Sequence, residues 1–302
     1  MRLGVYIRAA RVPFLTGSLM PVALAGALAC WQGAWEGSFY FFITALGVVG
    51  LHSGGNLIND YYDSFGSDPI NRYITPFSGG SRVIQNGELS AETVRNLAYA
   101  CMGMGVACGL VLMYYGRPYV ALLGLLGLAA AYLYSASPVQ LMSKGWGELV
   151  IFLAFGPVLT LGSYYAITGQ MIPKAFYVGY PLAFLITAIL WINEFPDLEA
   201  DTAVAKQHLV ARLGLQRSRY VYAALMMIPF LSLPFLMEIF DLPGHLFAGL
   251  VALPLAVRAV RLAWDTPPTD EEFVGVQALT IKTHFLLGLS LTLALLYAAW
   301  WR

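Results

Sequence analysis

Charge is scarce in this chain. Asp, Glu, Lys and Arg make up 11% of its 302 residues and hydrophobic residues 59%, whereas typical soluble domains carry about 25% charged and about 45–50% apolar residues. A surface that faces water over its whole area cannot be covered with so few charges. A disordered chain is excluded as well, because such chains are poor in apolar residues. The composition therefore indicates an integral membrane protein, surrounded by a lipid bilayer.

The chain also has no net charge and few cysteines and histidines. Each of these features argues against a class of protein or of metal site. The 17 basic residues balance the 17 acidic ones, so a general polyanion binder is excluded and no nucleic acid is expected as a partner. The three cysteines lie in apolar runs, which argues against a disulfide framework and against a thiolate metal site. The four histidines show no spacing that suggests zinc.

Long apolar runs, in contrast, are abundant. A helix needs about 20 mainly apolar residues to cross the hydrocarbon core of a membrane. Nine segments approach or exceed this length: 13–31, 38–58, 94–114, 119–137, 149–168, 175–193, 218–240, 245–263 and 279–300. Basic residues precede the first segment as in a signal peptide, but its length and the eight later runs favour a retained helix. We therefore predict an all-α, multi-pass transmembrane bundle of about nine spans, with residues 1–302 as a single domain.

The distribution of Lys and Arg predicts the orientation of these spans, because loops on the cytoplasmic side carry an excess of basic residues. With the N-terminus inside, 14 of the 17 basic residues fall on the inner side. Those that fall outside are Arg117, Lys174 and Arg302. We expect the protein in the inner (cytoplasmic) membrane, with its N-terminus inside and its C-terminus outside.

Two segments on the inner side are unusually acidic. Next to the ends of apolar spans they hold nine of the 17 acidic residues: Asp60, Asp63, Asp68, Glu88, Glu92, Glu194, Asp197, Glu199 and Asp201. Ionisable groups at membrane depth are costly, so their default interpretation is functional. We expect these two segments to cap a central cavity that opens toward the cytoplasm.

The second acidic segment has the simpler spacing. Asn193, Asp197 and Asp201 recur every four residues. On one helix they drift by only about 40° per step and therefore form a single stripe. The spacing predicts a helix face that carries one amide and two carboxylates.

The first acidic segment repeats this spacing with one irregularity. Asn59 and Asp63 reproduce the first step, but Asp68 comes nine residues after Asn59, and Ser67 stands at the eighth position. On a continuous helix Asp68 would point away from the stripe. We therefore expect Gly66 to break or bulge the helix and allow Asp68 to return.

Carboxylates at this spacing suit a hard divalent cation. Mg²⁺ takes oxygen ligands and is usually held by one or two carboxylates together with substrate phosphates. A basic residue stands 13 positions after each asparagine, Arg72 in the first segment and Lys206 in the second, and such cations bind phosphate oxygens. The alternative is that both segments are solvated loops whose acids balance nearby arginines. The matched spacing favours a site for a metal-chelated diphosphate.

A diphosphate held at the mouth of an apolar bundle implies a substrate with a long lipid tail. If its allylic C–O bond ionises, the carbocation must be shielded from water and stabilised by aromatic faces. Aromatic residues are plentiful near both acidic segments. Tyr134 is the foremost candidate to line the reaction chamber, because it adjoins the inner loop 135–138.

These motifs resemble a known family. An Asn-x3-Asp motif ends the second span and an Asn-x3-Asp-x3-Asp motif ends the sixth, and together with nine spans they are similar to the UbiA-type intramembrane prenyltransferases. Stretches 59–72, 80–87, 145–148, 155–157 and 206–214 are similar to the branch that prenylates 1,4-dihydroxy-2-naphthoate in menaquinone synthesis. The resemblance covers nearly the whole chain. It implies transfer of a polyprenyl group from polyprenyl diphosphate to this aromatic acceptor, with release of CO2 and diphosphate to give demethylmenaquinone.

The resemblance also implies roles for individual residues. Asp63 and Asp197 would be catalytic. The Mg²⁺ (or Mn²⁺) ligands would be Asp63, Asp68, Asp197 and Asp201, with Asp60 as the substitute for Asp68, because the family's usual third position is Ser67 here. Asn59 and Asn193 would orient the acids, and Arg72, Arg82 and Lys206 would hold phosphate oxygens.

Other interpretations remain open at this point. Branches that act on 4-hydroxybenzoate, homogentisate, or haem or chlorophyll precursors share the acidic motifs. A divalent-cation transporter is the alternative from another class, but it predicts acids deep in several spans, and the middles of the spans here hold almost none. Two residues have either a functional or a packing role: His52 could orient an acceptor hydroxyl, and Glu148 could act as a base.

Overall fold

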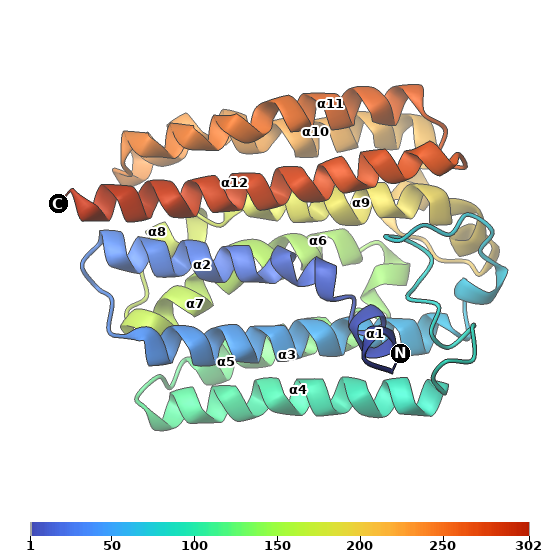
Figure 1. Ribbon diagram of the computed structural model, residues 1–302, viewed down its shortest axis with the longest axis horizontal. Coiled ribbons are helices and arrows are strands. Elements are labelled where there is room, and N and C mark those ends of the chain that lie inside the picture. The colour runs from blue at the N-terminus through green and yellow to red at the C-terminus, as the bar shows by residue number, and fades with distance from the viewer. Residues whose placement is uncertain (1, 302) are drawn as a thin grey trace.

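The chain folds into a bundle of helices in the computed structural model, which describes residues 2–301 (Figure 1). Arg302, expected on the outer side, lies outside the described residues. Within them every regular element is a helix, and eight segments are long and apolar enough to cross a membrane. The predicted all-α transmembrane bundle is thereby confirmed. The eight segments are Val12–Trp31, Ser38–Asp63, Ala91–Tyr114, Gly147–Thr168, Pro173–Ala203, Leu209–Phe240, Gly244–Asp265 and Glu271–Trp300.

The ninth expected span, 119–137, is a shorter helix, α5, at Val120–Leu133. Its 14 residues extend about 21 Å at 1.5 Å per residue, less than the roughly 30 Å of a bilayer core. Among the described residues, eight of the nine expected spans are therefore long enough to cross a membrane, and α5 is an apolar helix that falls short of this length.

Several spans are built from more than one helical element. The elements, in chain order, are α1 (Arg2–Ala9), η1 (Val12–Leu15), α2 (Thr16–Trp31), α3 (Ser38–Asp63), η2 (Asp68–Ile70), α4 (Ala91–Tyr114), α5, η3 (Leu141–Lys144), α6 (Gly147–Leu153), η4 (Ala154–Val158), α7 (Leu159–Thr168), α8 (Pro173–Tyr177), α9 (Tyr180–Ala203), α10 (Leu209–Phe240), η5 (Gly244–Ala252), α11 (Leu253–Asp265), η6 (Glu271–Phe273) and α12 (Val274–Trp300).

The joint between α6 and α7 is a π-helical turn, η4, which contains Pro157. Proline lacks an N–H and cannot complete the regular hydrogen-bond ladder, so the wider turn accommodates it. Helix α10 is likewise interrupted at Gly214, whose φ of 74° and ψ of 161° are not helical. The uninterrupted part of α10 that follows this glycine contains the expected span 218–240.

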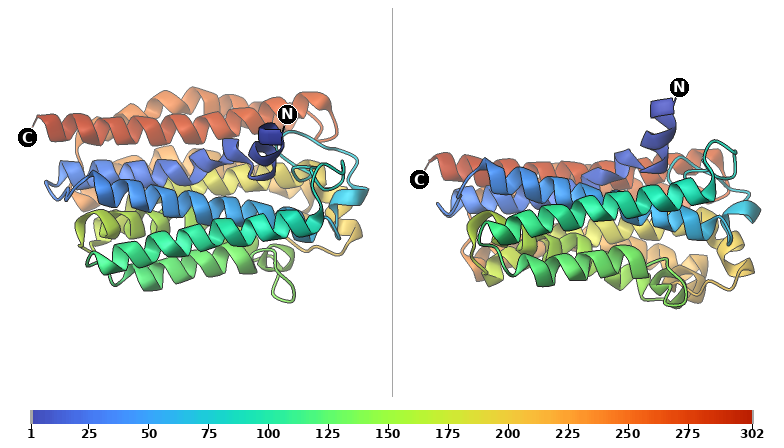
Figure 2. Two further views of the ribbon diagram at one scale, coloured as in Figure 1. Left: turned by 60° about the horizontal axis from the view of Figure 1, so that its bottom comes forward. Right: turned by 90° about the horizontal axis from the view of Figure 1, so that it is seen from below.

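Helix α9 occupies the centre of the bundle. In its most apolar stretch 72% of the residues are buried, against 22% in α4 and in α10. The two further views place α4 and α11 on the outside of the bundle (Figure 2). The largest core cluster unites buried residues of α2, α7, α9, α10, α11 and α12. The outer helices therefore direct apolar side chains toward lipid, and α9 carries its polar stripe within protein.

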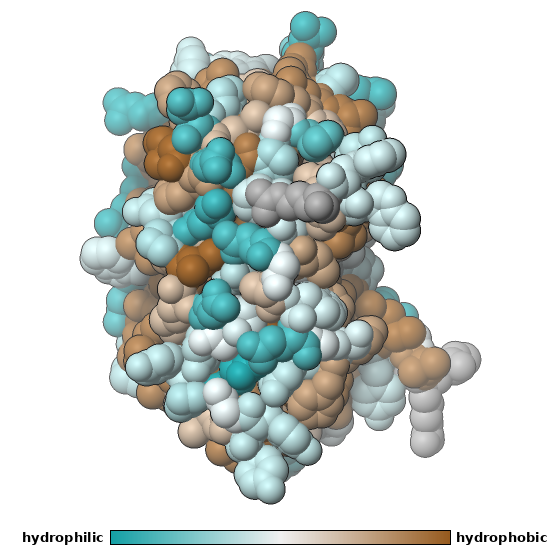
Figure 3. Space-filling model, turned by 90° about the vertical axis from the view of Figure 1, so that its left-hand side faces the viewer, coloured by the Kyte–Doolittle hydropathy of each residue, from teal (hydrophilic) through white to brown (hydrophobic). Residues whose placement is uncertain are grey.

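Both acidic segments lie at the same end of the bundle, where α3 and α9 end and the loop 64–90 covers them (Figure 1). The opposite end, which carries the C-terminus, shows hydrophilic side chains scattered among apolar and weakly polar ones (Figure 3). The fold thus gathers the acids, which lie more than a hundred residues apart in sequence, at one mouth of the bundle.

Candidate active site

A single cavity of about 280 Å³ connects the acidic end with the apolar interior. The predicted site residues that line it are Asn59, Asp63, Asp68, Tyr134, Asn193, Asp197, Asp201 and Lys206. Helix α3 supplies the first two, α9 supplies the stripe Asn193–Asp197–Asp201, the short helix η2 supplies Asp68, and the loop after α9 supplies Lys206. The two predicted stripes therefore face the same space.

Lys206 joins the two acidic segments. Its Nζ lies 2.9 Å from the Asp63 Oδ1 and 3.0 Å from the Asp201 Oδ1, and it donates to the Ser67 Oγ at 3.0 Å. Burial alone would lower the pKa of Lys206, but the carboxylates of Asp63 and Asp201 raise the pKa above its usual value. The ammonium is therefore charged and holds α3 and α9 together.

Asp197 anchors the loop that covers the site. Its Oδ1 accepts a hydrogen bond from the Asn71 Nδ2 at 2.7 Å, and its Oδ2 accepts one from the Gly79 N–H at 3.2 Å. Both donors belong to the loop between η2 and α4. The carboxylate of α9 thus fixes a loop that is distant in sequence above the cavity mouth.

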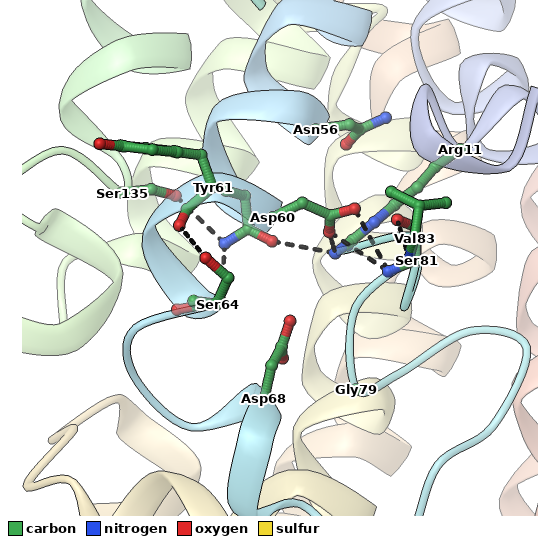
Figure 4. Close-up of polar contacts among 12 residues, drawn as sticks. Arg11, Asn56, Asp60, Tyr61, Ser64, Asp68, Gly79, Ser81, Val83 and Ser135 are labelled. Carbon is green, nitrogen blue, oxygen red and sulfur yellow. Dashed lines mark hydrogen bonds and ion pairs between the residues drawn. The ribbon is translucent and has the colours of Figure 1, made fainter. Parts of the chain in front are cut away.

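Asp68 returns to the cavity as the spacing predicts. Helix α3 ends at Asp63, ahead of Gly66, and Asp68 opens the short helix η2. Figure 4 shows its side chain pointing back toward the end of α3. Burial and then the charge of Asp63 raise the pKa of the Asp68 carboxyl to about 7.

A substitution at Gly80 tests whether activity depends on the position of the Asp68 carboxylate. Its φ is +78°, and a Cβ built on it would lie 2.3 Å from the Asp68 Oδ2. We expect Gly80→Ala to displace the Asp68 carboxylate and to lower kcat/KM by about tenfold or more. Gly87→Ala is the matched control, since Gly87 has a similar φ of +69° but open space around its Cβ. Steady-state kinetics of both variants measure the difference, and an equal effect on both would show that backbone strain alone is responsible.

Asp60, unlike Asp68, is not among the residues that line the cavity. Figure 4 shows Arg11 of the N-terminal segment reaching Asp60 of α3, beside Ser81. The two side chains form an ion pair, and the Ser81 N–H donates to both Asp60 oxygens at 3.3 Å. Asp60 therefore fixes the N-terminal segment and the covering loop, and Asp68 is the acid that faces the cavity.

Arg11 also orients Asn59. The Asn59 Oδ1 accepts a hydrogen bond from Arg11 at 3.1 Å, and its Nδ2 donates to the Asp63 Oδ2 at 3.0 Å and to the Ser135 Oγ at 3.1 Å. The amide is thus held in one orientation and directs Asp63. Its counterpart on α9, Asn193, accepts from Gln277 at 3.0 Å through its Oδ1.

Two of the expected phosphate-binding cations lie away from the cavity. The Arg72 side chain is 79% exposed and lies 4.0 Å from Glu199. Arg82 donates to the main-chain oxygen of Asp68 and so supports η2 from behind. Of the three cations expected to bind phosphate, only Lys206 lines the cavity.

Sequence reasoning missed the position of Arg11 and the network around His208. Arg11 could be read only as one of the basic residues ahead of the first span, because its partner lies 49 residues away. The His208 ring lies 3.4 Å from Glu194 and 3.4 Å from Asp201. Burial opposes its charge, but the proximity of these two carboxylates raises the pKa of His208 to about 10.

Glu148 joins the same buried network. One of its oxygens accepts a hydrogen bond from the Leu209 N–H at the start of α10. Ligand atoms of Glu148, Glu194 and His208 lie within 4.8 Å of one another, close enough to share a metal ion. In the described chain the charged imidazolium of His208 provides the positive partner of this group. In the sequence, the feature that could have indicated a role for Glu148 is the pair Gly147-Glu148 just before the fifth expected span.

Two acidic stripes thus face each other across one cavity whose deeper wall is apolar, within a helical membrane bundle. The model of the UbiA prenyltransferase family matches residues 18–287, and the chain belongs to this family. It is accordingly a transferase of prenyl groups.

Individual relatives agree with this assignment. UbiA prenyltransferase domain-containing protein 1 of Xenopus tropicalis is 25% identical over 287 residues, which cover 94% of this chain and 79% of the relative. The 1,4-dihydroxy-2-naphthoate octaprenyltransferase of Mycobacterium tuberculosis is 28% identical over 255 residues, or 84% of either chain. The solved structure of a UbiA homolog from Archaeoglobus fulgidus bound to GPP and Mg²⁺ has the same fold, with a TM-score of 0.61, 16% identity, and coverage of 94% of this chain and 99% of that one.

Proposed function

We propose that the protein transfers a polyprenyl group from polyprenyl diphosphate to 1,4-dihydroxy-2-naphthoate in a Mg²⁺-dependent reaction, which yields CO2, diphosphate and the reduced (quinol) form of demethylmenaquinone. The observation that carries this proposal is the pairing of the two acidic stripes across one cavity, with Lys206 between Asp63 and Asp201. A lipid tail fits the apolar continuation of the same cavity, which is lined by residues such as Val48, Ile151 and Leu190.

The donor set fits a hard divalent cation. Asp63, Asp68, Asp197 and Asp201 line the cavity with carboxylate oxygens, which are the ligands that Mg²⁺ prefers. A positive charge already lies between two of them, the ammonium of Lys206, so their arrangement accommodates a cation. The Archaeoglobus fulgidus relative was solved with GPP and Mg²⁺, which supports the same assignment here. When bound, Mg²⁺ supplies positive charge that stabilises the departing diphosphate.

The residues of the chain perform the remaining tasks. Lys206 donates to a phosphate oxygen and compensates its charge. As the C–O bond between the prenyl carbon and diphosphate breaks, the oxygen keeps the electron pair and an allylic cation forms within the cavity. Aromatic rings of Phe14, Phe77 and Tyr134 line this space, and their faces stabilise the cation and exclude water. The electron-rich ring then attacks, and the carboxylate leaves as CO2.

The choice of acceptor rests on the motifs and on the names of relatives. The Mycobacterium tuberculosis relative is a 1,4-dihydroxy-2-naphthoate octaprenyltransferase, and the stretches that extend beyond the acidic motifs are similar to that branch. The positive residues of the inner segments support a location in the inner membrane, with the cavity opening toward the cytoplasm.

The experiment that tests this function uses membranes that contain the overproduced protein. They are incubated with a labelled polyprenyl diphosphate and a panel of aromatic acids, with and without Mg²⁺. We expect lipid-soluble labelled product with 1,4-dihydroxy-2-naphthoate and Mg²⁺, and none after chelation. A product with another acid would overturn the acceptor, and metal flux into liposomes without any product would overturn the enzyme itself.

A further inference from the structure

One polar pair lies in the apolar part of the cavity. His52 of α3 and Ser18 of α2 both line it, and the His52 Nδ1 lies 2.9 Å from the Ser18 Oγ. Neighbouring wall residues such as Val48, Leu51 and Ile186 are apolar. Polar groups in such surroundings cost free energy unless their hydrogen-bonding capacity is used. The pair therefore needs an explanation beyond packing.

The hydrogen bonds of the pair determine which imidazole nitrogen is free. Ser18 has one hydroxyl proton, and it donates this proton to the main-chain oxygen of Leu15 at 3.1 Å. We therefore assign the Ser18 Oγ as the acceptor in its contact with His52, which places the imidazole proton on Nδ1 and makes Nε2 a hydrogen-bond acceptor. Within the described chain this Nε2 has no protein partner and is not sealed from the cavity, whereas the unpartnered Nε2 of His284 is fully buried.

The position of His52 relates it to the acidic end. It precedes Asn59 by seven residues on α3, which is about two helical turns, so both residues share one helix face about 10 Å apart along the axis. Phe155 packs against the imidazole in a T-shaped arrangement, with ring centroids 4.7 Å apart. Phe155 belongs to the π-helical turn η4, a feature that occurs frequently at functional sites. Helices α2 and α3 and the π turn η4 thus fix the position of the His52 imidazole in the cavity wall.

We propose that the His52–Ser18 pair is the subsite for the 4-hydroxyl of the aromatic acceptor, which donates a hydrogen bond to the His52 Nε2. The 1-hydroxyl, by contrast, lies next to the carboxylate of the acceptor and can bond to it. This inference rests on the proposed function and deepens it. A prenyl tail has no hydrogen-bond donor, so of the two substrates only the hydroxylated ring can use this nitrogen. A ring bound here lies between the pair and the diphosphate end, where it meets the prenyl carbon.

The test compares four variants in steady-state kinetics. Loss of the acceptor nitrogen in His52→Phe should raise KM for 1,4-dihydroxy-2-naphthoate about tenfold and leave KM for polyprenyl diphosphate unchanged. His52→Gln, whose amide reaches the place of Nε2, should retain most of the affinity for the acceptor. His52→Asn, whose amide reaches only the place of Nδ1, should resemble His52→Phe. Ser18→Ala should raise the same KM by a smaller factor.

A ligand analogue identifies the group that is recognised. 1-Hydroxy-2-naphthoate, which lacks the 4-hydroxyl, is used as a competitive inhibitor so that its lower ring reactivity does not matter. We expect the loss of this hydroxyl to weaken binding about tenfold in the unsubstituted protein and to have little effect in His52→Phe, since the two changes remove the same interaction.

The control is His284→Phe, which removes a buried histidine of α12 outside the cavity and should leave both KM values unchanged. An unchanged acceptor KM in His52→Phe, or equal impairment of His52→Gln and His52→Phe, would refute the subsite while the prenyl transfer itself persists. Failure of the unsubstituted protein to prenylate any aromatic acid would instead refute the proposed function. The two failures are therefore distinguishable.

Discussion

Asp197→Asn should lower kcat/KM for prenyl transfer by about 10²- to 10³-fold, the size of effect seen when one group that stabilises transition-state charge is removed. The substitution keeps the shape of the side chain, and the new amide oxygen still accepts a hydrogen bond from Asn71 or Gly79, which both donate to Asp197. The other donor loses its acceptor, which costs about 1–3 kcal/mol, so we expect a moderate fall in the thermal unfolding midpoint beside a far larger loss of activity. The measurement is product formation from labelled polyprenyl diphosphate as a function of Mg²⁺ concentration.

Glu199→Gln is the matched control for this experiment. Glu199 lies two residues further on α9, and its side chain is 65% exposed, so removal of its charge should change kcat/KM by less than about twofold. Asp63→Asn, on the facing helix, should behave like Asp197→Asn. Full activity of both Asp63→Asn and Asp197→Asn would exclude the acidic stripes as the catalytic centre.

Lys206→Met should destabilise the metal-free protein by about 3–5 kcal/mol, the usual cost of removing one partner of a buried ion pair. The variant leaves Asp63 and Asp201 facing each other without the ammonium that now lies within 3.0 Å of each. Transfer activity should fall as well, because the same ammonium would bind a phosphate oxygen. Thermal unfolding in detergent measures the first effect, and labelled product formation measures the second.

Magnesium should stabilise Lys206→Met more than it stabilises the unsubstituted protein, since a divalent cation replaces the missing positive charge. Lys282→Met is the control, because Lys282 is an exposed basic residue of α12 and its loss should change neither stability nor the response to Mg²⁺. Equal unfolding temperatures of the Lys206 and Lys282 variants would show that the bridge between α3 and α9 contributes nothing.

The fold was predictable because a helix must have a minimum length and an apolar composition to cross the membrane core. Both properties can be read from the sequence. The acidic stripe of α9 was equally predictable, since Asn193, Asp197 and Asp201 lie on one uninterrupted helix. Asp68 was within reach because a glycine separates it from α3. These inferences use local geometry, which spacing along the chain determines.

Loop residues were beyond such reasoning. Arg72 follows Asn71, whose extended backbone, with φ −69° and ψ 126°, ends the short helix η2 and removes any fixed relation to Asn59. Arg11 acts on Asn59 and Asp60 from 48 and 49 residues away, a contact that only the packed bundle creates. His52 could be placed on a span, but only the facing Ser18 and Phe155 show how its ring is used.

Because the covering loop is hydrogen-bonded to Asp197, binding of a cation at the site and attachment of the loop are thermodynamically coupled. The Asn71 amide and the Gly79 N–H are both held by the oxygens of this carboxylate. A cation that coordinates these oxygens would weaken their hydrogen bonds to the loop. By linkage, the attached loop would lower the affinity for the cation by the same factor. If Asp197 binds the cation, amide hydrogen exchange of the loop should therefore change when Mg²⁺ is added.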